Sequence, residues 1–170
     1  TNTAGAASPN ASTNTVSGLN GWITNMTMTF SGLSHERIQD VNMLLVSPSG
    51  IGVVLFSEVS GQNRKCTNTT ITFDDSVFYA LPQDFDLWSE PLRAASFQAT
   101  NYYPGATWSN APVLLSSFNG ISPNGDWKLY VYDDSTNNNG IIAGGWSLRI
   151  ATSTRPAISR EQPTRRDSSW

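Results

Sequence analysis

The apolar residues of this chain recur with the two-residue period of a β-strand, and no ten-residue stretch shows the 3.6-residue period of a helix. In two stretches the alternating side chains are predicted to share an inward face: Trp22, Met26, Met28 and Phe30 in the first, and Trp146, Leu148 and Ile150 in the second. This pattern restricts the chain to an all-β fold.

Other segments fit the same class. The run Val41–Val46 is continuously apolar, which is typical of a strand covered on both faces. It is followed by Ser47-Pro48-Ser49-Gly50, whose turn chemistry predicts a hairpin with Ile51–Phe56. Further strands are predicted at Thr69–Phe73 and Trp127–Tyr132. Loops of mixed length between these strands favour an antiparallel β-sandwich of the Greek-key or jelly-roll type over a regular meander.

The domain is expected to span residues 13–151. Residues 1–12 are small and polar, which predicts a linker or an edge segment, and 152–170 are expected to form a disordered tail or linker. Residues 76–115 hold four prolines and eight aromatic residues, too many prolines for a helix and too many aromatics for disorder. We interpret them as a long packed crossover with short strands.

Charge excludes one class of partner. Charged residues make up only 14% of the chain, and the formal net charge is −3. The basic residues do not cluster as phosphate binding requires, so nucleic acid is not an expected partner. No apolar run approaches the roughly 20 residues of a membrane span.

The residues needed for catalysis are scarce. His35 is the only histidine and hence the only possible histidine base, but it stands where a loop leaves a strand, and no Gly-x-Ser-x-Gly motif occurs, so a serine or cysteine hydrolase is not expected. The adjacent carboxylates Asp74-Asp75 and Asp133-Asp134 stand at loop entries and point apart, which does not favour a glycosidase pair. A non-catalytic chain is therefore expected, with His35 in a structural hydrogen bond and no assigned role for Cys66.

Calcium is a better use for these carboxylates, because it accepts six to eight oxygens from Asp, Asn and backbone groups of loops. The run 133–140 is rich in such oxygens, although it does not match an EF-hand. The hypothesis is a loop-built calcium site, and the alternative is an Asn-rich surface turn. The candidate ligands are Asp40, Asp74, Asp75, Asp133, Asp134 and Asn139.

Two longer stretches carry a resemblance when taken together. The first runs from Leu33-Ser34-His35 to Asp40 and through the apolar strand to Ser47-Pro48-Ser49-Gly50. The second runs from Gly125-Asp126-Trp127-Lys128-Leu129 to Asp133-Asp134 and ends in Trp146-Ser147-Leu148. In this order they resemble the P domain, or P/Homo B domain, of subtilisin-like proprotein convertases, in the variant found in bacterial proteins. One departure is Asn42, where bacterial relatives often have Asp.

The resemblance implies a jelly-roll-like, galactose-binding-domain-like sandwich that packs beside a subtilisin-like catalytic domain, in cis or in trans, and stabilises it. It also implies a secreted or cell-surface protein, and any serine endopeptidase activity would belong to a parent protein. An alternative is a binding module for carbohydrate or protein, in which exposed aromatics stack on sugar rings. The candidate aromatics are Trp88, Tyr102, Tyr103 and Trp108.

Overall fold

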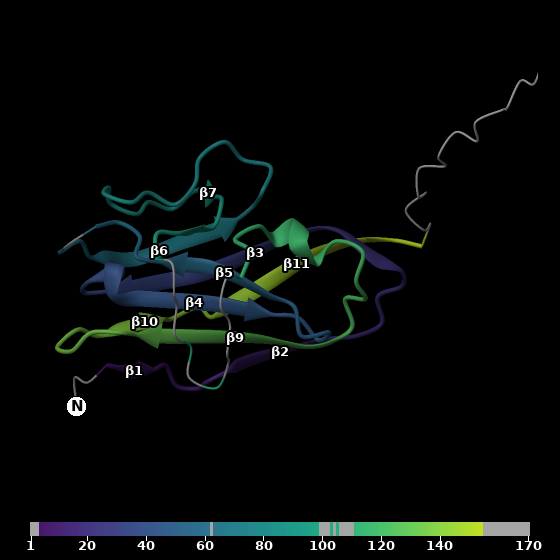
Figure 1. The fold of residues 1–170 in the computed structure, drawn as a ribbon, viewed down its shortest axis with the longest axis horizontal. Helices are drawn as coiled ribbons and strands as arrows, with labels where there is room; N and C mark the ends of the chain where they lie inside the picture. Colours follow the sequence, from purple (N-terminus) through teal and green to yellow (C-terminus); the bar gives the residue numbers. More distant parts are fainter. Residues whose placement is uncertain (1–3, 62, 99–102, 104, 106–110, 155–170) are drawn as a thin grey trace, which may run out of the picture.

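A computed structural model describes residues 4–61, 63–98, 103, 105 and 111–154, which form two β-sheets packed as a sandwich (Figure 1). The six-stranded sheet has the order β1 (Gly5–Ala6), β9 (Gly125–Asp133), β4 (Val41–Val46), β5 (Gly52–Ser57) and β8 (Ala95–Ser96), with β2 (Ser12–Val16) also paired to β9. The five-stranded sheet has the order β10 (Gly140–Ile142), β3 (Trp22–His35), β6 (Cys66–Phe73) and β7 (Pro91–Leu92), with β11 (Trp146–Ser153) also paired to β3. The described chain contains two short 3₁₀ turns, η1 (Ile38–Asp40) and η2 (Leu115–Phe118), and no α-helix. The all-β sandwich prediction is confirmed.

The predicted hairpin between β4 and β5 is present. The backbone N–H of Ser47 donates to the carbonyl of Ile51 at 2.8 Å, and Gly50 takes a φ of 86°, which glycine adopts without the steric cost of a side chain. In β4, Val41–Leu45 are all buried, as the continuous apolar run predicts.

The predicted inward face of β3 is right for Met26, Met28 and Phe30 and wrong for Trp22. Trp22 is 49% exposed, and Ile23 is buried in its place. The reason is a bulge, since Ala151 pairs with Asn25 while the next residue of β11 pairs with Ile23. One extra residue in β3 shifts the alternation, so the face reverses towards the start of the strand.

The main core lies between the sheets. Phe30 of β3 meets Phe73 of β6 edge to face with ring centroids 5.5 Å apart, and Phe118 of η2 meets Trp127 of β9 at 5.0 Å. Trp127 is fully buried, and its indole N–H donates to the carbonyl of Pro123 at 2.9 Å. The inward orientation of Trp146, Leu148 and Ile150 is confirmed, because all three pack against this core.

A second, smaller core covers the outer face of the six-stranded sheet. Leu44 of β4 and Val54 of β5 pack there against Tyr103, which the long crossover supplies. The backbone N–H of Val54 also donates to Pro112 at 2.9 Å. The crossover therefore explains why β4 and β5 are apolar on both faces.

The crossover also adds two short strands that pair in parallel with their neighbours. It contributes β7, which pairs parallel with β6, and β8, which pairs parallel with β5. The prediction of an antiparallel sandwich holds for the long strands and is wrong for these two short pairs. A connection this long can return the chain in the same direction, which a tight hairpin cannot do.

The segment 1–12, expected to be a linker or an edge, contributes β1 and the first residue of β2 at an edge of the six-stranded sheet. Gly5 pairs with Asp133 and Ser12 pairs with Leu129. At the other end, β11 runs to Ser153, and residues 155–170 of the expected tail lie outside the described residues.

Candidate functional site

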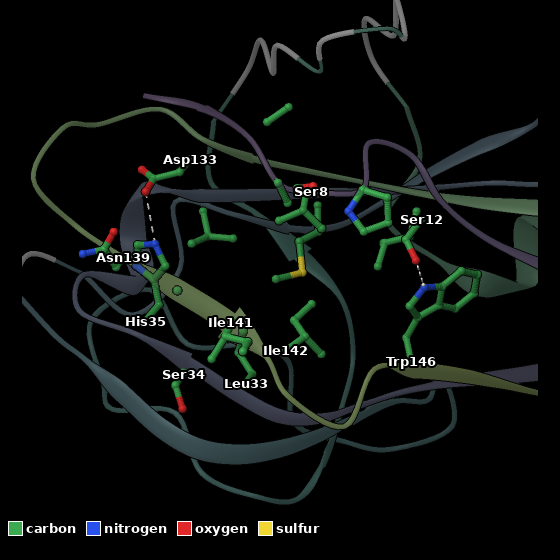
Figure 2. A pocket seen from close by; sticks show the side chains of 18 of the residues that line it. Ser8, Ser12, Leu33, Ser34, His35, Asp133, Asn139, Ile141, Ile142 and Trp146 are labelled. Carbon is green, nitrogen blue, oxygen red and sulfur yellow. Dashed lines mark hydrogen bonds and ion pairs between the residues drawn. The ribbon is translucent and has the colours of Figure 1, made fainter. Parts of the chain in front are cut away.

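His35 stands at the end of β3, where it pairs with Cys66 of β6 and with Gly140 of β10. The ring is buried, and its Nδ1 accepts the backbone N–H of Arg37 at 3.1 Å. In the neutral ring the other nitrogen then carries the proton, so Nε2 donates to Asp133 Oδ2 at 3.2 Å (Figure 2). Both ring nitrogens are thus used in structural hydrogen bonds, as the expected role of His35 requires.

Asp40 and Asp134 lie beside this pair, because Val41 pairs with Asp133 at the neighbouring ends of β4 and β9. Asp40 is buried and accepts the side-chain N–H of Asn138 at 2.8 Å, and its other oxygen lies 3.4 Å from Arg37 Nε. The backbone N–H of Asp134 donates to the carbonyl of Asp40 at 2.9 Å. Three carboxylates therefore gather at one end of the sandwich.

Asn42 completes this cluster from within β4. It is buried, it donates to Asp134 Oδ2 at 2.9 Å, and its own carbonyl oxygen accepts the Ser57 hydroxyl at 2.7 Å. An Asp at this position would add a fourth negative charge and would have no proton to donate to Asp134. The departure noted in the sequence thus replaces a charge by a hydrogen-bond donor.

Asp40 and Asp134 lie in surroundings that disfavour their ionised forms. Burial raises the pKa of Asp40, and the nearby Asp133 raises it further, although Arg37 opposes both effects. Burial also raises the pKa of Asp134, against the lowering effect of the Asn42 hydrogen bond. A bound cation would lower the pKa of both groups.

Asp74 and Asp75 are not part of this cluster. Asp74 follows the last residue of β6, Phe73, and seven strand steps of about 3.3 Å separate Phe73 from Cys66 beside His35. Asp74 accepts hydrogen bonds from the backbone N–H and the hydroxyl of Ser76, which closes a turn. Asp75 accepts the backbone N–H groups at the start of η2, at 3.2 Å and 2.7 Å.

Asn139, the sixth predicted calcium ligand, lies near His35 and is bound through its backbone. Its N–H donates to the Glu36 carboxylate at 3.0 Å, and its carbonyl accepts the Glu36 N–H at 3.1 Å. The structure thus divides the predicted set, with Asp40, Asp133, Asp134 and Asn139 at one end and the remaining two at the other. Among the described residues, no group of three or more His, Cys, Asp or Glu side chains is arranged to hold a metal ion.

Next to this cluster, a cavity of about 500 Å³ opens between the sheets (Figure 2). His35, Asp133 and Asn139 line one end, and Trp146 lines the other. Leu33 and Ile142 form part of the apolar wall between them. The sequence did not reveal this cavity, because β1, β3, β9 and β10 meet only in the fold and share no motif.

Cys66 has the opposite character to a catalytic thiol. It is 5% exposed, and burial raises the pKa of its thiol to about 11. A thiol nucleophile needs a lowered pKa, so Cys66 is suited to packing.

The aromatic residues expected to stack on sugars are not all available for it. Tyr103 is 1% exposed in the outer core, which is a correction to that hypothesis, whereas Trp88 is 38% exposed. Tyr102 and Trp108 lie outside the described residues. More exposed rings occur elsewhere on the crossover, notably Phe78 at 84% and Tyr79 at 64%, and these two meet edge to face.

Fold and site together define a β-sandwich domain whose single histidine is used structurally and lies beside three carboxylates, Asp40, Asp133 and Asp134, at one end of the sandwich. The chain belongs to the family described as the proprotein convertase P-domain, whose sequence model matches residues 25–150. That family is a non-catalytic accessory domain of proprotein convertases, and its members are typically found in secreted proteins. The match begins within β3 and ends within β11, so it covers strands of both sheets and leaves out β1 and β2.

Comparison with curated proteins and comparison with solved structures gave no match. In the described part of the chain, no helix has the length and apolar character needed to cross a membrane.

Proposed function

We propose that this chain is the accessory domain of a secreted subtilisin-like serine endopeptidase, which it stabilises by packing beside the catalytic domain, in cis or in trans. The family match over residues 25–150 is the observation that carries the proposal. The structure supports a non-catalytic role, because both nitrogens of His35 are engaged by Asp133 and by the backbone of Arg37. Neither is left to activate a hydroxyl or thiol.

The test uses the parent protein. The open reading frame that contains this chain should encode a subtilisin-like domain, and the parent should be compared with a version that lacks residues 1–170. We expect the shortened protein to unfold at lower temperature and to yield less active enzyme, because the contact with the sandwich is lost. A parent without such a domain, or an unchanged melting temperature and yield, would contradict the proposal.

A second test addresses catalysis by the chain alone. The isolated chain is expected to show no hydrolysis of peptide or ester substrates above the buffer rate. Hydrolysis that disappears in His35→Ala and persists in Trp22→Ala, an exposed site on the same strand, would contradict the accessory role.

Binding of a protein partner is a second candidate function, and the exposed crossover favours it. Phe78 and Tyr79 are far more exposed than aromatic rings usually are, and they belong to the segment that connects β6 and β7, the two strands labelled in the upper part of Figure 1. Their planes are 86° apart, so they offer no flat platform for a sugar ring. Substituting both by Ser should weaken association with the catalytic domain and leave the melting temperature of the isolated chain unchanged within about 2 °C.

Calcium binding is also proposed, with a reduced ligand set of Asp40, Asp133, Asp134 and Asn139. Support comes from the gathering of three carboxylates at one end and from the raised pKa values of Asp40 and Asp134. Their oxygens already accept hydrogen bonds from His35, Asn42 and Asn138, so an ion would have to displace some of these donors.

A further inference from the structure

The cavity between the sheets has a definite position in the fold. Along one side of the sandwich, β1 and β2 follow each other at the edge of one sheet, and β10 and β11 do the same at the edge of the other. The β2 and β11 half is closed, because Trp146 Nε1 donates to Ser12 Oγ at 2.9 Å and Asn14 Nδ2 donates to the Trp146 carbonyl at 3.1 Å. The β1 and β10 half is where the cavity opens.

The opening exposes part of the inner face of β9. Trp127 and Leu129 point into the core and are at most 1% exposed. Val131 and Asp133 continue the same face but are only half-buried, and both line the cavity. Side chains that would be covered by the opposite sheet in a closed sandwich are therefore accessible here, which is typical of a ligand cavity in a β fold.

The two ends of the cavity differ in chemistry. In Figure 2, Asp133, His35 and Asn139 lie at one end and the Trp146 indole lies at the other, with Leu33 and Ile142 between them. A ligand that fills this space needs an apolar body next to Ile142 and Trp146 and a polar group at the other end. The volume of about 500 Å³ falls in the range of roughly 300 to 1,000 Å³ that is usual for small-molecule sites.

The polar end favours a positive group. Asp133 Oδ2 accepts from His35, and Oδ1 accepts the backbone N–H of Ser135 at 3.0 Å, but an ionised carboxylate can accept about four hydrogen bonds. Its side chain is 21% exposed, so it can be reached. Asp40 and Asp134 add negative charge behind it, and Arg37, at 3.4 Å from Asp40, is the cation paired with this cluster.

We propose that the cavity between β1 and β10 binds an amphipathic amine, with its ammonium group at Asp133 and its apolar chain along Ile142 towards Trp146. The Asp133 carboxylate attracts an ammonium group most strongly, attracts a neutral hydroxyl less and repels a carboxylate. This site is independent of the contact with a catalytic domain, so either proposal can fail without the other.

The probes are hexylamine, hexanol and hexanoate, which share one apolar chain and differ in the charged end. Each is titrated into the full chain at neutral pH while backbone amides and tryptophan indole N–H groups are followed by NMR. We expect hexylamine to bind about tenfold more tightly than hexanoate, with hexanol between them. The shifts should include Ile142 and the Trp146 indole, which reports on its bond to Ser12.

Two variants locate the site and its charge preference. Ile142→Trp fills the cavity and should abolish binding of all three probes, whereas Leu114→Trp, at a 42% exposed position away from the cavity, should bind like the original chain. Asp133→Asn keeps the shape of the side chain and should reduce the preference for hexylamine over hexanoate to less than about threefold.

Three results would overturn the proposal: equal affinity for amine and carboxylate, an unchanged preference in Asp133→Asn, or shifts that fall outside the cavity. If Ile142→Trp does not fold, the NMR chemical-shift changes in the original chain decide whether the probes bind in the cavity. Shifts confined to the cavity residues then support the site, and absent or scattered shifts refute it.

Discussion

The close packing of Gly140 against His35 predicts how substitutions at the two positions combine. A Cβ atom added to Gly140 would lie 2.2 Å from the ring carbon Cδ2 of His35 and 3.0 Å from the carbonyl oxygen of Ser34. The first distance is far below van der Waals contact, so in Gly140→Ala either β10 or the ring has to move. Movement of the ring weakens its bond to Asp133.

The expected cost follows from these contacts. Overpacking of a filled site costs about 1 to 3 kcal/mol, and the gain of about 0.4 to 1 kcal/mol from restricting the unfolded chain partly offsets it. Gly140→Ala should therefore lower the free energy of unfolding by about 1 to 2 kcal/mol. His35→Ala should lower it by about 2 to 4 kcal/mol, because a buried ring and two hydrogen bonds are lost.

The double variant separates this mechanism from a general weakening. Without the ring, the Cβ at position 140 meets chiefly the Ser34 carbonyl, so the second substitution should cost less than about 0.5 kcal/mol. The measurement is urea unfolding of all four proteins, with equal slopes required for the comparison. Gly140→Ala combined with Asp75→Ala is the control and should be additive, because Asp75 follows the far end of β6.

Additive costs in the Gly140→Ala and His35→Ala pair, within about 0.5 kcal/mol, would refute the reasoning. They would mean that the ring does not fill the space over Gly140.

Asp75→Ala should cost about 1 to 2 kcal/mol in urea unfolding because two backbone N–H groups of η2 lose their acceptor, whereas Asp84→Ala, at an exposed site, should change stability by less than about 0.5 kcal/mol. For Cys66, the folded pKa of about 11 exceeds the ordinary 9.0, so its contribution to stability, roughly 3 kcal/mol, is present below about pH 9 and lost as the pH rises towards 11. Cys66→Ala should therefore lose less stability than the original chain between about pH 8 and pH 11, and parallel losses would contradict this. Calcium at about 100 times its Kd should stabilise the chain by about 2.7 kcal/mol, and chelator should reverse the rise in melting temperature, whereas equal melting temperatures in calcium and chelator would refute the reduced ligand set.

The alternation of apolar residues was sufficient to predict the long strands. It was insufficient wherever the pairing between strands decides which face a side chain occupies. Alternation identified Met28 and Phe30 as core residues because each side of a strand has its own environment. It failed at Trp22, since the bulge that reverses the face depends on the register with β11. A single extra residue in one strand leaves no signal in the sequence of that strand.

The candidate site shows the same limit. Asp40 and Asp133 could be proposed as neighbours from the sequence because both stand at strand ends, but so do Asp74 and Asp75, and only the register places these two at the other end. Their role in a turn and at the start of η2 is a general property of Asp that competes with metal binding. The cavity was not predictable, because it is formed by strand edges that meet only after both sheets have assembled.

The two ends of the cavity also connect the two sheets. His35 on β3 donates to Asp133 on β9, and Trp146 on β11 donates to Ser12 on β2, so each hydrogen bond joins one sheet to the other. These two hydrogen bonds thus connect the sheets at both ends of the cavity, whereas the sheets are separated by the cavity between them. A ligand that contacts Asp133 and Ile142 together would add a third connection and would raise the free energy of unfolding in proportion to its occupancy. His35, with both ring nitrogens engaged, therefore serves the stability of the sandwich itself.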